Sequence, residues 1–118
     1  MEITQVLCGI AVADLDRSKR WYELLFGRRA DAEPMPGLTE WRSSAGVVQL
    51  VLDEQRAGGS LVTLQVVDVR AAVTDLASCG GPAVQVDDTT SDKVWFAEID
   101  DPDGNGVTVV EVRPGVQL

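Results

Sequence analysis

Residues 6–27 read VLCGIAVADLDRSKRWYELLFG, and this stretch determines the fold that the sequence predicts. The uncharged run at its start is typical of a buried strand. Asp14 follows as a helix N-cap, because its carboxylate can accept hydrogen bonds from the free amides of the first turn. Apolar residues then recur at helical spacing, and Gly27 can adopt the left-handed backbone that ends a helix. We therefore expect a strand, a capped helix over 15–26 and a glycine stop.

The segment after this helix predicts three short strands. The candidates lie near 29–34, 38–44 and 46–53, and turn-forming residues separate them. The first half of the chain thus has the order of one strand, one helix and three strands, which is a βαβββ module.

The same order recurs with an offset of 54 residues, which aligns Leu7 with Leu61. Residues 61–67 form a second uncharged run, Asp68 takes the capping position and Gly81 takes the stop position. We therefore predict an α+β fold of two βαβββ modules, residues 1–57 and 58–118 of one domain. The modules should pack together, because each alone has too little core. The second set of strand candidates lies near 83–88, 93–99 and 105–113, and the aligned identities are Leu7/Leu61, Val12/Val66, Asp14/Asp68, Gly27/Gly81 and Trp41/Trp95.

The composition excludes several classes of function. The chain has 118 residues, a net charge of −9 and no histidine. Phosphate binding needs a basic surface, so the charge argues against a nucleic acid partner. Without imidazole there is no Ser-His or Cys-His catalytic arrangement. Cys8 and Cys79 are too few for a disulfide scaffold or a cysteine zinc site, and we expect both to be buried free thiols.

Nothing in the sequence predicts export or a membrane partner. The first residues carry no basic region ahead of an apolar core, so they do not predict a signal peptide. No apolar run approaches the roughly 20 residues that a membrane span needs. Together with the free thiols, these features indicate a cytoplasmic protein.

Two motifs carry a resemblance to a known family. Residues 12–18 read VADLDRS and are followed by Trp21-Tyr22 and Leu25-Phe26-Gly27, and residues 101–105 read DPDGN. In this order, and with the internal repeat, they resemble the vicinal oxygen chelate superfamily of glyoxalase I, extradiol dioxygenases, fosfomycin-resistance enzymes and bleomycin-resistance proteins. The resemblance implies that the strands form a curved mixed sheet around a cleft, with the helices on the convex side.

The resemblance also implies where a metal ion would be held. Metal-dependent members carry their ligands on the concave face, and the matching positions here are Leu7, Gln49, Leu61 and Thr108. Two leucines, an amide and a threonine do not hold a divalent cation, which needs imidazole, thiolate or carboxylate donors. We therefore predict no metal and no other cofactor.

Strand alternation places the same four residues in the cleft, which gives an apolar lining with a few neutral hydrogen-bonding groups. Trp41 and Trp95 stand at equivalent places in the two modules. Each would offer a ring to an aromatic ligand or pack in the core, and alternation alone does not decide between these. The predicted ligand-binding residues are Leu7, Trp41, Gln49, Leu61, Trp95 and Thr108.

The acidic turn at 101–105 does not fit a calcium loop. The EF-hand register places Ile99 and Val110 at its first and last ligand positions. We therefore expect the acids of this turn to be solvated. Alternation puts Glu111 on the opposite strand face from Thr108, so we expect Glu111 to be either structural or exposed at a sheet edge.

We favour a metal-independent small-molecule binding protein of the bleomycin-resistance type, which sequesters an aromatic or cationic antibiotic or metabolite. The resemblance implies a homodimer, and the acidic charge would attract a cationic ligand. The main alternative is a lyase, isomerase or dioxygenase-like enzyme with non-standard residues such as Glu40 or Glu98, although the sequence identifies no catalytic residue. An interaction module with a vestigial cleft and a metabolite sensor also remain open.

Overall fold

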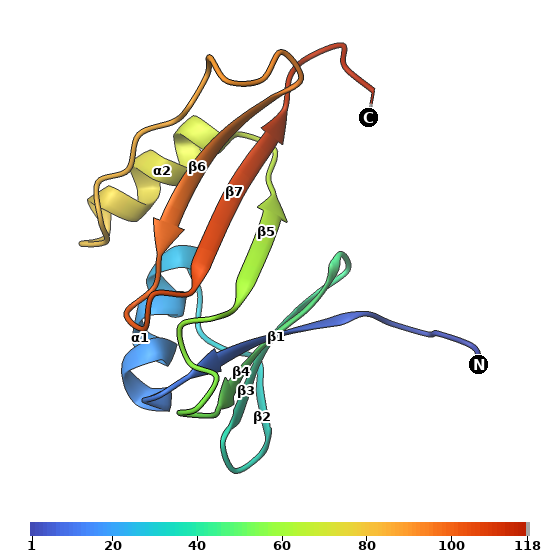
Figure 1. The fold of residues 1–118 in the computed structure, drawn as a ribbon, viewed down its shortest axis with the longest axis vertical. Coiled ribbons are helices and arrows are strands. Elements are labelled where there is room, and N and C mark those ends of the chain that lie inside the picture. The colour runs from blue at the N-terminus through green and yellow to red at the C-terminus, as the bar shows by residue number, and fades with distance from the viewer. Residues whose placement is uncertain (118) are drawn as a thin grey trace.

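A computed structural model describes residues 1–117, and residue 118, the last of the predicted second module, lies outside the described residues. The first module contains β1 (Leu7–Val12), α1 (Leu15–Phe26), β2 (Ala32–Met35), β3 (Leu38–Ser43) and β4 (Gly46–Leu52). The second contains β5 (Leu61–Gln65), α2 (Val69–Ser78), β6 (Val94–Asp100) and β7 (Gly106–Val112). The predicted α+β fold of two related modules is confirmed (Figure 1).

The strands form two mixed sheets. The first sheet has the order β1-β4-β3-β2, in which β1 and β4 run parallel and the other pairs antiparallel. The second has the order β5-β7-β6, with β5 parallel to β7 and β6 antiparallel to it. Both helices lie on the same side of the two sheets, and the opposite side, which we call the open face, carries no helix (Figure 1).

The predicted strand near 83–88 is wrong. Among the described residues, a single bridge joins this segment to β6, through the backbone of Asp87 and Phe96. The Asp87 carboxylate then accepts hydrogen bonds from the amides of Thr89 and Thr90, which turns the chain away from β6. The second sheet therefore has three strands where the sequence predicts four.

Both helices begin as their sequence predicts. The Asp14 carboxylate accepts a hydrogen bond from the Arg17 amide at 3.0 Å, and Asp68 does the same for Ala71 at 3.0 Å. The carboxylate of Glu111 adds a second bond at the start of α2, from the Val69 amide at 2.9 Å. Glu111 is therefore structural, which is one of the two predicted alternatives. Gly27 ends α1 with a φ of 69°, the left-handed backbone that glycine adopts without strain.

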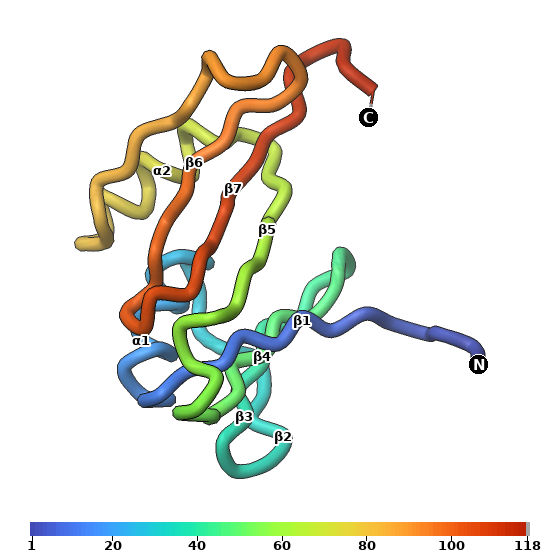
Figure 2. Tube along the Cα trace, viewed as in Figure 1, coloured from blue at the N-terminus to red at the C-terminus, as the bar shows by residue number. Residues whose placement is uncertain are grey.

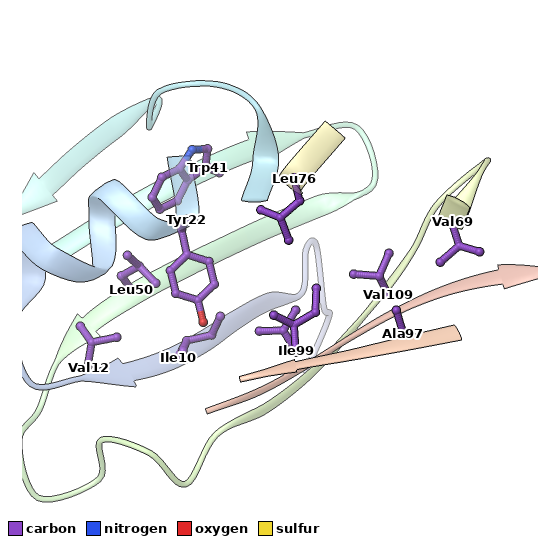
Figure 3. Close-up of a cluster of buried hydrophobic side chains, with 11 residues drawn as sticks. Ile10, Val12, Tyr22, Trp41, Leu50, Val69, Leu76, Ala97, Ile99 and Val109 are labelled. Atoms are coloured by element: carbon purple, nitrogen blue, oxygen red, sulfur yellow. The ribbon is translucent and has the colours of Figure 1, made fainter. Parts of the chain in front are cut away.

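The two modules share one core. Its side chains come from the inner faces of both sheets and from both helices, and Figure 3 shows them as one cluster. A common core explains why the modules pack together, because burial of apolar area is the main favourable term in folding. The buried members are Ile10, Val12, Tyr22, Trp41, Leu50, Val69, Leu76, Ala97, Ile99, Val107 and Val109.

The start of the chain lies apart from this core. Figure 2 shows the residues before β1 continuing away from the rest of the molecule, and they carry the exposed side chains of Ile3 and Val6. Neither helix among the described residues has the length and apolar character needed to cross a membrane.

Candidate ligand-binding site

The open face of the first sheet is set by alternation along β1 and β4. Ile10 and Leu50 point into the core, so their neighbours along each strand point the other way. Leu7 lies there and is 44% exposed. Gln49 lies on the same face, in register with Gly9. The first sheet thus brings two of the predicted site residues to its open face.

The open face of the second sheet carries the other two. Leu64 and Val109 pack on the core side, which leaves Leu61 and Thr108 on the opposite side of β5 and β7. Leu61 is 86% exposed. Glu98 is also on this face, directly across from Thr108 in the strand register. A single chain therefore presents these residues without enclosing them.

The two tryptophans lie on the other side of their sheets. Trp41 is only 3% exposed, its ring packs on Phe26 with centroids 5.2 Å apart, and its Nε1 donates to the carbonyl of Arg28 at 3.1 Å. The residues on either side of it along β3, Glu40 and Arg42, lie on the open face, so Trp41 lies on the core side. Trp41 therefore cannot contact a ligand on the open face.

Trp95 likewise shares the core side of β6 with Ala97. The guanidinium groups of Arg70 and Arg113 lie 5.8 and 5.4 Å from its ring centroid, as in cation–π contacts. The equivalent placement of the two tryptophans thus reflects equivalent packing roles and not two walls of a cleft.

A buried carboxylate lies beside Gln49 on the open face, and the sequence did not single out this arrangement. Glu40 is 4% exposed, and one of its oxygens accepts two hydrogen bonds from Arg42, at 3.0 and 2.7 Å. The other oxygen accepts a hydrogen bond from Nε2 of Gln49. The bonds from Gln49 and Arg42 hold the pKa of Glu40 below its usual value. Because the carboxylate favours its ionised form, Glu40 does not fit a general acid.

The carboxylate of Glu40 fixes the orientation of the Gln49 amide. An ionised carboxylate only accepts hydrogen bonds, so the amide must turn its NH₂ group toward Glu40. The carbonyl oxygen Oε1 of Gln49 is then the free acceptor, and it has no hydrogen-bond donor among the described residues. The first sheet therefore offers one oriented acceptor on this face, beside the ion pair of Glu40 and Arg42.

A cavity of about 570 Å³ opens on the same side, where the two modules join. Its floor is made of Gly9, Ala11 and Val51, and its rim is the linker between β4 and β5. Gly9 and Ala11 leave room above the sheet because their side chains are small. The cavity thus lies next to the predicted residues without being lined by them.

The acids of the 101–105 turn are buried, which corrects the expectation that they are solvated. The carboxylate of Asp103 accepts hydrogen bonds from Arg17 Nη2 at 2.8 Å, the Ala13 amide at 3.2 Å and Ser18 Oγ at 3.4 Å. Asp101 accepts a hydrogen bond from the Tyr22 hydroxyl at 2.8 Å. Burial of the hydroxyl raises the pKa of Tyr22 most, and its hydrogen bond to Asp101 raises the pKa further. This turn therefore fastens the second module to the first.

The cysteines also differ from expectation. Cys8 is half-buried and Cys79 is exposed, although both are free as predicted. Cys8 points toward the core from β1, and burial raises the pKa of its thiol. Cys79 is exposed because it follows the last turn of α2, where the chain leaves the core.

A family model confirms the resemblance. Residues 3–109 match the model of the Glyoxalase/Bleomycin resistance protein/Dioxygenase superfamily. The chain belongs to this superfamily. At the superfamily's metal positions, however, Leu7, Leu61, Thr108 and Gln49 supply two hydrocarbon groups, a hydroxyl and an amide, which do not fit a divalent ion. Among the described residues, no group of three or more histidine, cysteine or acidic side chains is arranged to hold a metal.

Solved structures share this fold over more than nine-tenths of the chain. A glyoxalase/bleomycin resistance protein from Catenulispora acidiphila is 26% identical, with a TM-score of 0.83 over 92% of this chain and 97% of that one. TnmS3, an antibiotic binding protein from Streptomyces sp. CB03234, is 24% identical, with a TM-score of 0.72 over 95% and 98%. Lactoylglutathione lyase from Agrobacterium tumefaciens is 17% identical, with a TM-score of 0.72 over 93% and 95%. No curated protein matches the sequence.

Proposed function

We propose that this protein binds a small organic molecule without a metal ion and holds it on the open face of its sheets. The observation that carries the proposal is the Gln49 carbonyl, which is left as a free acceptor because the amide donates its N–H to the buried Glu40 carboxylate. Ligand sites are typically apolar with a few placed polar groups that fix orientation. Leu7, Leu61 and Thr108 provide the rest of the proposed lining.

The ligand, in this proposal, has an apolar or aromatic body and one hydrogen-bond donor. A donor is required because Oε1 of Gln49 can only accept. A cationic donor suits the site best, since the net charge of −9 attracts cations and speeds their association. Sequestration of an antibiotic of this type would parallel the antibiotic binding protein TnmS3, which has the same fold.

We further propose that the site is completed in a homodimer. Leu61 and the apolar residues ahead of β1 are too exposed to enclose a ligand within one chain. A second copy laid against the open face would cover them and bury the ligand between two sheets. We place this activity in the cytoplasm, where the free thiols of Cys8 and Cys79 would stay reduced.

Titration calorimetry with three naphthalene probes tests the proposal. 1-Naphthylmethylammonium has charge and N–H donors, 1-naphthalenemethanol has a donor without charge, and 1-naphthylmethyl-trimethylammonium has charge without a donor. We expect the first probe to bind most tightly and the trimethylated probe to bind at least ~10-fold more weakly, the equivalent of one lost hydrogen bond.

Gln49→Met should abolish the preference for a donor, and Gln85→Met, an exposed glutamine outside the site, should retain it. Equal binding of the three probes by the wild type, or an unchanged preference in Gln49→Met, contradicts the proposed site. The titration follows heat and not fluorescence because Trp41 and Trp95 lie on the far side of the sheets.

A further inference from the structure

A second cavity lies on the helix side of the molecule, between the two modules. It has a volume of about 200 Å³ and is bounded by α1, β5, α2, β6 and β7. Leu25 and Phe26 come from the first module, and Leu64, Val73 and Leu76 come from the second. Leu64 points to the core side of β5, opposite to Leu61. The sheet therefore separates this cavity from the open face and from the proposed ligand site.

Every side chain that lines this cavity is apolar. Water needs two or more polar partners to be held in a cavity, and these side chains offer none. A peptide segment is also a poor occupant, because the polar atoms of the lining are main-chain atoms only and the side chains offer its buried backbone groups no hydrogen-bond partner. The chemistry of the lining thus selects a small molecule that is itself apolar.

The size of the cavity narrows the class of ligand. Cavities of about 150 Å³ lined by aliphatic and aromatic side chains stay dry and take up benzene or xenon. A cavity of about 200 Å³ has room for one substituted aromatic ring or a short alkyl chain. Leu76 and Ile99 are buried and form a fixed floor, whereas Leu25 and Val73 are half-buried and leave an entry from solvent.

We propose that this inter-module cavity is a separate binding site for a neutral single-ring aromatic or short-chain hydrocarbon ligand. The ligand lies between α1 and α2 and contacts both modules. Binding is driven by removal of the ligand's apolar surface from water, and by van der Waals contacts between the ligand and the side chains that line the cavity. This site is independent of the open face and does not rest on the function proposed above.

Methyl-detected NMR with toluene as the probe tests this site. In the wild type, toluene should cause saturable shifts of the Leu64, Val66 and Val73 methyl signals and leave Leu7 and Leu61 unchanged. 1-Naphthylmethylammonium should not compete, because a charged group is costly to desolvate in an apolar cavity. The absence of saturable shifts, or shifts centred on Leu7 and Leu61, overturns the proposal without any need for a variant.

A matched pair of alanine substitutions gives the second test. Ala72 lines the cavity and Ala71, its neighbour on α2, is exposed to solvent. Ala72→Leu should fill the cavity and weaken toluene binding at least ~10-fold, whereas Ala71→Leu should leave it within ~2-fold of the wild type. Equal toluene affinities for the two variants, both with dispersed wild-type-like spectra, would overturn the proposal.

Discussion

The hydroxyl of Tyr22 donates a 2.8 Å hydrogen bond to the carboxylate of Asp101, which joins α1 of the first module to the turn before β7 of the second. Both residues are buried, with exposures of 0% and 5%. The accepting oxygen has one other bond, from the side-chain amide of Asn105 at 2.8 Å. This buried hydrogen bond therefore links the two modules inside the shared core.

Tyr22→Phe should lower the free energy of unfolding by about 2 kcal/mol, because it removes a buried hydrogen bond to a charged group. Urea unfolding followed by circular dichroism measures the loss. A double-mutant cycle with Asp101→Ala supplies the control, since this substitution removes the accepting oxygen and contacting residues give non-additive effects. Effects that add to within ~0.3 kcal/mol would show that the bond contributes nothing of its own.

The same pair predicts a dependence of stability on alkaline pH. The pKa of Tyr22 is raised in the folded protein, so the folded state keeps a proton that the unfolded state releases above pH ~10. The stability from this tyrosine is complete below that pH and is lost as the pH rises further. The stability difference between the wild type and Tyr22→Phe should therefore shrink by about 1.4 kcal/mol per pH unit above pH ~10.

Urea unfolding of both proteins between pH 9 and about 11 measures this difference, because a solvent-exposed tyrosine ionises within this range. Other titrating groups are common to both proteins, so their contributions cancel in the comparison. A constant difference across this range would mean that Tyr22 titrates alike in both states.

The local features of the fold could be predicted because they depend on nearby residues. Asp14 and Asp68 cap helices through amides three residues away, and the strand alternation around Ile10 reads directly from its neighbours. The segment near 83–88 shows the limit of this approach. Its apolar pattern favours a strand, but the hydrogen bonds of Asp87 to Thr89 and Thr90 compete with pairing to β6.

The features that were missed depend on partners far away in the sequence. Tyr22 and Asp101 are 79 residues apart, and nothing local to the 101–105 turn indicates that its carboxylates would be buried. The sequence does not decide which face of the sheet Trp41 takes, and the reason is related. Its neighbours Thr39 and Glu40 are both buried although they lie on opposite faces of β3, so alternation assigns no exposed side there.

Gln49→Met should raise the pKa of Glu40. The amide of Gln49 is the main cause of the lowered pKa, and methionine has no N–H to donate. The pKa of the Glu40 carboxyl should then lie closer to that of an ordinary glutamate side chain, as followed by NMR of its side-chain carbon. Gln85→Met is the control and should leave the titration unchanged. Identical titration of Glu40 in all three proteins would contradict the orientation assigned to the Gln49 amide.

Leu61→Glu should dissociate the proposed homodimer without unfolding the chain. The side chain is 86% exposed in one chain, so the substitution should change the unfolding free energy of the isolated chain by less than about 0.5 kcal/mol. In a dimer that covers the open face, the new carboxylate would be buried without a partner, which costs far more. Sedimentation velocity over a concentration series should therefore show the dimer dissociation constant rising at least ~10-fold. Ala77→Glu, which adds the same charge to an exposed position on α2, on the helix side of the sheets, should leave the dimer intact. A wild type that sediments as a monomer would exclude the dimer. A Leu61→Glu dimer as tight as that of the wild type would place the interface elsewhere, because the added charge would then lie in water.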